Sequence, residues 1–225
     1  MVYLLIGTSP FTEFFVRGRL IVRGDPAATA SNIVANEFLW RLGGVADLVG
    51  AVCDAGLALI FFTLFARVSP PVSLLAAFFR LVHVVLLAVI TAWHFGALSY
   101  LSTSSPIKGA APELLQAQAF TALRLHGIGF NIALVFFGFS CITLGYLIWR
   151  SLFLPRLIGL WVGLAGIGYL VNSVVHFLAP AYGAAAFRYV LLPCGIGELV
   201  FMIWLLAFGV NEERWKQQVP ASAIL

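Results

Sequence analysis

The sequence predicts an all-α, polytopic membrane protein: a compact bundle of six transmembrane helices, with a short interfacial helix in the first long loop. Of the 225 residues, 62% are hydrophobic and only 10% are charged, whereas soluble domains average about 45–50% apolar and about 25% charged residues. The apolar residues also fall into runs of about 20, which is the length that crosses a bilayer as a helix. So little charge excludes both a soluble globule and a disordered chain.

Six apolar runs define the expected spans, which together form one domain over residues 1–210. They lie at residues 1–16, 40–66, 72–101, 120–149, 155–179 and 188–210. The first run is short, since about sixteen helical residues reach only about 24 Å. In the loop that follows, Asp25 as N-cap and Pro26 at the first helical position predict the start of the interfacial helix. Residues 211–225 form a polar tail.

The charge pattern identifies the lipid bilayer, and not a nucleic acid, as the expected partner. The net charge of +4 is spread thinly, whereas nucleic-acid binding requires a basic stripe or face. Each of the three cysteines lies inside an apolar run, which is typical of buried thiols and not of a disulfide framework.

The orientation is predicted from the basic residues in the connections. With both termini inside, five basic residues fall on the cytoplasmic side and seven on the other, so the raw count favours the opposite orientation. The five, however, lie in very short turns or directly beside a span: Arg67, Arg150, Arg156, Arg214 and Lys216. We therefore expect N-in and C-in in the cytoplasmic (inner) membrane.

Four charged residues inside the spans are the predicted catalytic or relay residues. Such charges cost about 2.5–3.5 kcal/mol each on insertion scales and mark function by default. Asp47 and Asp54 share one face of the second span, because seven residues turn a helix to within about 20° of its starting direction. Arg80 and Glu198 lie at a depth similar to that of Asp54. Arg80 is therefore predicted to form an ion pair with Asp54 or Glu198.

Three histidines are predicted to lie near one membrane face: His94, His126 and His176. At 1.5 Å per residue, they and Asp47 fall within about 6–11 Å of that face. A catalytic zinc ion needs three protein ligands and an open position, so the histidines are candidate metal ligands and Asp47 is a candidate base. The predicted ligand-binding residues of the same pocket are Glu13, Asn131, Tyr169 and Asn172.

The same residues also fit purely structural roles. A buried ion pair can fix helix register, and lone histidines and asparagines often hydrogen-bond between membrane helices. Gly159, Gly163 and Gly166 in the fifth span would let a neighbouring helix approach closely.

Six segments carry a resemblance to a known family: FTEFFVRGRLIV, ADLVGAVCDAGLALIFFTLF, LAAFFRLVH, LHGIGFNIALVFFGF, GYLIWRSLFLPRLIGLWVGLAGIGYLVNS and GELVFMIWLL. They resemble the bacterial multi-pass membrane family called domain of unknown function 4386, over about residues 3–210. The resemblance implies a bundle of about six helices in the cytoplasmic membrane, and it implies no activity. The family pattern includes the positions of Glu13, Asp47, Asp54, Arg80, His126 and Glu198.

Three function classes fit these residues. The first is a polar intramembrane pocket for a small or lipid-like ligand, extended to metal-assisted hydrolysis if zinc is bound. The second is a proton-coupled small-molecule transporter in which Asp54, Arg80 and Glu198 form a relay. The third is a non-catalytic structural subunit of an oligomer or a larger membrane complex. Only the first class makes the protein an enzyme.

Overall fold

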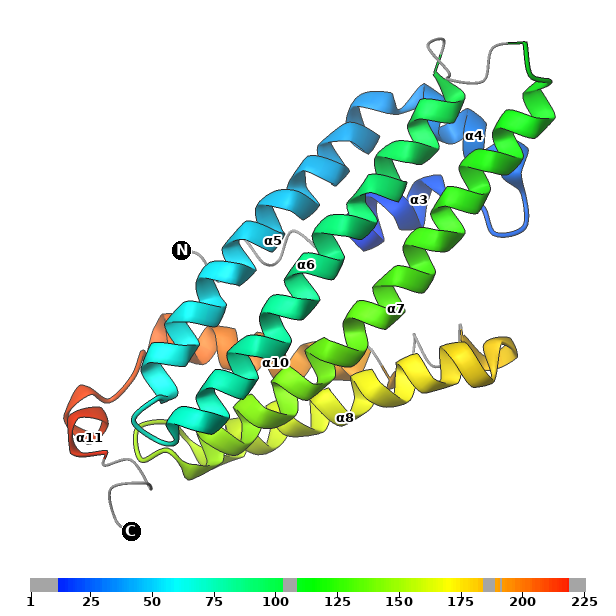
Figure 1. The fold of residues 1–225 in the computed structure, drawn as a ribbon. Helices are drawn as coiled ribbons and strands as arrows, with labels where there is room; N and C mark the ends of the chain where they lie inside the picture. The colour runs from blue at the N-terminus through cyan, green and yellow to red at the C-terminus, as the bar shows by residue number, and fades with distance from the viewer. Residues whose placement is uncertain (1–11, 103–108, 184–188, 191, 219–225) are drawn as a thin grey trace. The chain divides into compact units, whose positions relative to one another are not determined.

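The computed structural model describes residues 12–102, 109–183, 189–190 and 192–218, and all regular structure in them is helical. Figure 1 shows the elements, in order η1 (Thr12–Arg17), α3 (Gly18–Leu20), α4 (Pro26–Ala35), α5 (Glu37–Phe65), α6 (Pro70–Leu101), α7 (Pro112–Arg150), α8 (Arg156–Leu178), η2 (Pro180–Tyr182), α10 (Leu192–Ala207) and α11 (Glu212–Gln217). Within the described part, four helices are long and apolar enough to cross a membrane: α5, α6, α7 and α8. This set fits a membrane protein.

The expected spans from the second to the fifth coincide with α5 to α8, apart from the start of α7. This helix begins at Pro112 and not near residue 120. The stretch ELLQAQA after the proline consists of strong helix formers, but its three polar residues lower the hydropathy below that of a span. The sixth expected span contains α10, an apolar helix of 16 residues. Of the first expected span, residues 1–11 lie outside the described residues and the remainder belongs to η1.

Helix α4 begins where the sequence predicts it. The carboxylate of Asp25 accepts a hydrogen bond from the Ala28 backbone N–H at 2.8 Å, and Pro26 occupies the first helical position. This contact satisfies one of the backbone donors that every helix start leaves unpaired. The predicted N-cap is therefore confirmed.

The described chain divides into two compact units, and α5, α6 and α7 each contribute to both. Unit 1 comprises the described residues up to Cys53 and from Val84 to Phe130, and its core includes Val16, Ile33, Trp40, Ala97 and Leu98. Unit 2 comprises Asp54–His83 and the described residues from Asn131 onward. In its core Phe61 packs against Phe65 and Phe201, with ring centroids 6.2 and 5.6 Å apart.

In unit 2, α7 and α8 pack as antiparallel helices along a seam of glycines. A Cβ atom on Gly145 would lie 2.6 Å from the carbonyl oxygen of Gly159, and one on Gly138 would lie 2.9 Å from that of Gly166. Seven residues separate the two contacts on each helix, so they repeat every two turns on one face. Small residues let the two backbones touch, as is common between membrane helices.

Candidate functional site

Arg17 is the centre of a buried polar network in unit 1. Its Nε donates to Glu13, its Nη1 to Asp47 and to Nδ1 of His94, and its Nη2 to Thr12 and Asp47; the shortest of these contacts, to Glu13 and to Asp47, measure 2.7 Å. The Thr12 hydroxyl donates in turn to Asp47. All five guanidinium N–H groups therefore have acceptors. We call Thr12, Glu13, Arg17, Asp47 and His94 the Arg17 network.

The neighbouring carboxylates stabilise the charged form of Arg17. Its side chain is only 8% exposed, and burial by itself acts to lower the pKa of Arg17. The carboxylates of Glu13 and Asp47 outweigh that effect and raise the pKa above its ordinary value. The guanidinium therefore stays charged throughout the accessible pH range.

The contacts of His94 define a neutral ring. Nε2 lies 2.9 Å from the carbonyl oxygen of Trp40, which can only accept, so Nε2 carries the proton. Nδ1 then has a lone pair that accepts from Arg17 at 3.4 Å. The indole of Trp40 stacks on the imidazole, with centroids 4.0 Å apart, and its N–H donates to the His94 carbonyl oxygen. Both ring nitrogens are thereby engaged.

The predicted zinc ligands have the following surroundings in the structure. Since both nitrogens of His94 already have partners, that ring has no lone pair for a metal. His126 is buried in unit 1 with its ring centroid 6.3 Å from that of His94, and His176 lies in unit 2 against Phe177. No group of three or more His, Cys, Asp or Glu side chains among the described residues is placed to hold a metal ion.

The variant Arg17→Lys tests the geometry of the Arg17 network. Lysine keeps the charge but has three donors without the planar fork, so some of the buried acceptors lose their partner. An unsatisfied buried polar group costs about 1–3 kcal/mol, and we expect the free energy of unfolding to fall by that amount. The control is Arg19→Lys at an exposed position. Equal melting temperatures for the two variants would contradict this network.

In unit 2, Arg80 forms a buried ion pair with Asp54. Nε and Nη2 both approach Oδ1 of Asp54, at 2.7 and 2.6 Å, and the two side chains are only 6% and 7% exposed. The guanidinium also lies over the rings of Phe61 and Phe137, 5.5 and 5.4 Å from their centroids, within the range of a cation–π interaction. The prediction that Arg80 pairs with Asp54 or Glu198 is confirmed, with Asp54 as the partner.

The ring of Phe137 connects this ion pair to two further polar groups. The His83 imidazole lies 4.6 Å from it and the Tyr169 ring 5.3 Å, measured between centroids. Nδ1 of His83 donates to the carbonyl oxygen of Ala133 at 3.0 Å. The hydroxyl of Tyr169 donates to the carboxylate of Glu198. We define the Arg80 network as six residues: Asp54, Arg80, His83, Phe137, Tyr169 and Glu198.

Two predicted ligand-binding residues instead join α7 to α8. The side-chain amide of Asn172 donates to Oδ1 of Asn131 at 3.0 Å, and the Ser173 hydroxyl donates to the backbone carbonyl of Asn131 at the same distance. All three residues are buried. These contacts extend the glycine seam by two more turns, which is the interhelical role that the sequence left open for asparagine.

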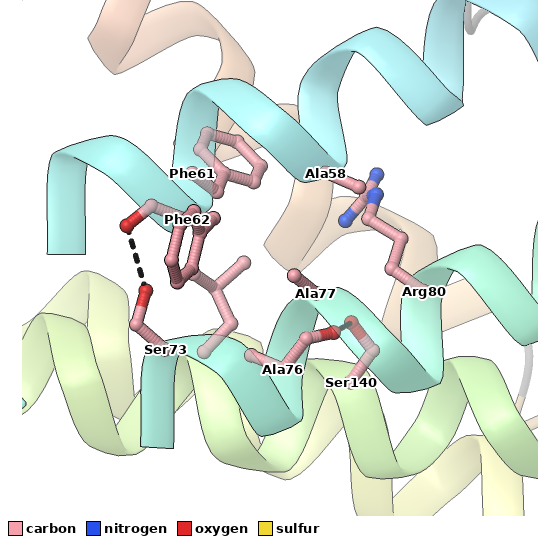
Figure 2. Close-up of a pocket in the computed structure, with 9 residues that line it drawn as sticks. Ala58, Phe61, Phe62, Ser73, Ala76, Ala77, Arg80 and Ser140 are labelled. Atoms are coloured by element: carbon pink, nitrogen blue, oxygen red, sulfur yellow. Dashed lines mark hydrogen bonds between the residues drawn. The ribbon is translucent and has the colours of Figure 1, made fainter. Parts of the chain in front are cut away.

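A small cavity borders the Arg80 network (Figure 2). It measures about 10 Å³, and its polar lining consists of Arg80, Ser73 and Ser140. Both hydroxyls donate hydrogen bonds to backbone carbonyl oxygens. Ser73 donates to Phe62 at 2.9 Å, and Ser140 donates to Ala76 at 3.1 Å. A space of this size holds at most one water molecule, so it is not the expected ligand pocket.

A larger groove of about 290 Å³ lies in unit 1, between α4, the end of α6 and the start of α7. None of the predicted site residues lines it. Neither the small cavity nor the groove therefore supports the expectation that Asp47 and the histidines share a ligand cavity.

Arg17, His83 and Phe137 make central contacts that the sequence pattern does not predict. Arg17 directly follows the expected first span, and Glu13 stands four residues before it, a spacing at which opposite charges pair on a helix. His83 and Phe137 carry no such local signal, because their importance comes from contacts between different helices.

The all-helical fold and the four long apolar helices fit a polytopic membrane protein. The family described as Domain of unknown function (DUF4386) matches residues 1–209, and the chain belongs to this family. It is also similar to an uncharacterized protein of Archaeoglobus fulgidus, with 22% identity over 158 residues that cover 70% of this chain and 78% of that protein. No solved structure matches it.

Proposed function

We propose that the protein is a proton-coupled transporter of a small molecule, and that Glu198 is the carboxyl group that takes up and releases the proton. One observation carries this proposal. In unit 2 the cation Arg80 is paired with Asp54, whereas the carboxylate of Glu198 is met by the neutral hydroxyl of Tyr169. No salt bridge to Glu198 occurs among the described residues.

The chemistry of the Tyr169–Glu198 pair suits proton exchange. Glu198 is half-buried on the apolar helix α10, and an ionised carboxylate without a cation is costly in a membrane span, so protonation removes that cost. A tyrosine hydroxyl can donate to the carboxylate and can accept from the carboxylic acid. Glu198 therefore keeps a hydrogen-bond partner in both protonation states.

The contacts around Phe137 supply a route from the proton to the ion pair. When Glu198 changes its charge, the orientation of the Tyr169 hydroxyl changes with it. Tyr169 packs on Phe137, and the Arg80 guanidinium lies over the same ring. Protonation of Glu198 would therefore change how Tyr169 packs on Phe137, and through that ring it would affect the Arg80–Asp54 ion pair.

The two other function classes have less support. Hydrolysis assisted by zinc needs three protein ligands, and both nitrogens of His94 are occupied. A purely structural role is favoured for unit 1, since the acceptors around Arg17 take up all of its N–H groups. A structural subunit of a larger complex is therefore the second candidate, and the experiment below distinguishes it from a transporter.

The proposal includes the arrangement in the membrane. We place the chain in the bacterial cytoplasmic membrane as a six-helix bundle, in which α10 and the first expected span add to α5 to α8. Both termini lie inside, because the basic residues of the short turns then face the cytoplasm. A small or lipid-like ligand is the expected cargo.

Glu198→Gln tests the function in proteoliposomes that contain the full chain and a trapped pH-sensitive dye. We expect some members of a panel of small solutes to drive a proton flux through the wild type, and the flux to vanish in Glu198→Gln at an unchanged melting temperature. Glu212→Gln, at an exposed position on α11, is the control and keeps the flux. A flux that survives in Glu198→Gln contradicts the role of Glu198. If no solute drives a flux through the wild type, the structural candidate is favoured.

A further inference from the structure

The C-terminal segment Asn211–Gln218 is bound to the turn between α5 and α6. The indole N–H of Trp215 donates to the carbonyl oxygen of Leu64 at 3.0 Å. That carbonyl belongs to the last turn of α5, where no intrahelical donor is available. The Arg67 guanidinium lies 4.1 Å from the centroid of the Trp215 ring, and its Nη1 donates to the backbone oxygen of Lys216 at 3.5 Å.

The same segment also holds the turn between α7 and α8. The side-chain oxygen of Gln218 accepts from the Leu152 backbone N–H at 3.0 Å, and the backbone N–H of Asn211 donates to the carbonyl of Phe153 at 3.5 Å. Helix α11 lies next to both turns (Figure 1). The C-terminal segment therefore ties two turns, far apart in sequence, into one end of unit 2.

This end of unit 2 is basic. Five basic residues lie on the tied segments: Arg67, Arg150, Arg156, Arg214 and Lys216. All except the half-buried Arg67 are exposed. The acidic residues on the same described segments are Glu212 and Glu213. Positive charge is therefore in excess on this surface, and it comes from three separate pieces of chain.

We propose that this basic end of unit 2 binds the anionic phospholipid headgroups of the adjacent leaflet. Arg150 is the last residue of α7 and Arg156 is the first of α8, so both stand at the ends of candidate spans, where headgroups lie. Groups of four to eight basic residues beside a span attract anionic lipid, and arginine matches phosphate with two parallel hydrogen bonds. Trp215 is of the residue type enriched at membrane interfaces.

The C-terminal segment is expected to support lipid binding through its contacts with the two turns. Because the segment holds Arg67, Arg150 and Arg156 on one surface, a change that releases it weakens lipid binding without removing any charge. Trp215→Ala is such a change, since it removes the hydrogen bond to Leu64 and the ring below Arg67.

The test measures the melting temperature of the purified full chain in neutral detergent with added phosphatidylglycerol or phosphatidylcholine. We expect phosphatidylglycerol to raise the melting temperature more, and this difference to disappear in the double variant Arg150→Gln/Arg156→Gln. In Trp215→Ala we expect the difference to fall by about half. Raising the salt from about 0.1 M to about 1 M shortens the Debye length from about 10 Å to about 3 Å and should shrink the wild-type difference.

The matched control removes the same number of exposed charges from unit 1, as Arg19→Gln/Arg23→Gln, and keeps the wild-type difference. The proposal is overturned if Arg150→Gln/Arg156→Gln keeps the difference, or if the control loses it equally. It is also overturned if inorganic phosphate at the same phosphate concentration raises the melting temperature as much as phosphatidylglycerol, because the site then takes a free anion. If Trp215→Ala does not fold, the arginine variants alone decide.

Discussion

Replacing Arg80 by alanine is expected to lower the free energy of unfolding by about 3–5 kcal/mol, because it leaves the buried carboxylate of Asp54 without its cation. The two side chains are nearly inaccessible and their closest atoms are 2.6 Å apart. Arg80→Ala also removes the guanidinium from the faces of Phe61 and Phe137. The loss is measurable as a fall in melting temperature, or in the denaturant concentration at the midpoint, of the protein in mild detergent.

The double variant Arg80→Ala/Asp54→Ala separates the pair from other effects of the substitution. If the lone carboxylate causes most of the damage, removing it as well restores part of the stability, and the two single losses are not additive. Arg156→Ala, at an exposed position, is the control and melts as the wild type does. Additive losses in the double variant would show that the two residues do not act as a pair.

The second large effect is expected at the glycine seam. In Gly145→Ala the new methyl group would lie 2.6 Å from both the Gly159 carbonyl oxygen and the Gly163 nitrogen. These are backbone atoms, so α7 and α8 must move apart. Overpacking of this kind costs about 1–3 kcal/mol, and occasionally more. We therefore expect Gly145→Ala to melt well below the wild type.

Gly163→Ala is a matched control, since a Cβ atom at this position meets nothing within 4 Å. Alanine is favoured over glycine in a helix by about 1 kcal/mol, so this variant should melt at or slightly above the wild-type temperature. The comparison holds the chemistry of the substitution constant and changes only its place on the seam. Equal melting temperatures for the two variants would show that α7 and α8 do not touch at Gly145.

The apolar helices could be predicted from the sequence because they depend on composition along the chain, and the family could be predicted because six segments resemble it. The ion pair of Arg80 could also be predicted, since an intramembrane charge must find one of very few partners. The N-terminal side of α7 was not predicted, because Glu113, Gln116 and Gln118 interrupt its apolar residues. A hydropathy criterion finds only the part of a helix that crosses the membrane, whereas residues that favour a helix can extend it beyond that part.

The arrangement of the histidines and glycines could not be predicted, because it depends on the directions of side chains from two helices. The sequence predicts that His94 shares a site with other histidines because they lie at a similar depth in the membrane. In the structure, however, the ring nitrogens of His94 bind Arg17 and the Trp40 backbone. Gly159 and Gly163 looked equivalent in sequence. Only the register against α7 directs a Cβ atom on Gly159 at the α7 backbone and one on Gly163 into open space.

The central claim, that Glu198 binds and releases a proton within the membrane domain, is tested most directly by infrared difference spectroscopy of the full chain in a bilayer. The spectra compare low with high pH and follow the C=O stretching band of a protonated carboxylic acid. We expect a wild-type band that is absent in Glu198→Gln, retained in Glu212→Gln, and shifted in Tyr169→Phe, because the hydroxyl partner is lost. A pH-dependent carboxylic acid spectrum that is the same in Glu198→Gln as in the wild type would contradict the claim.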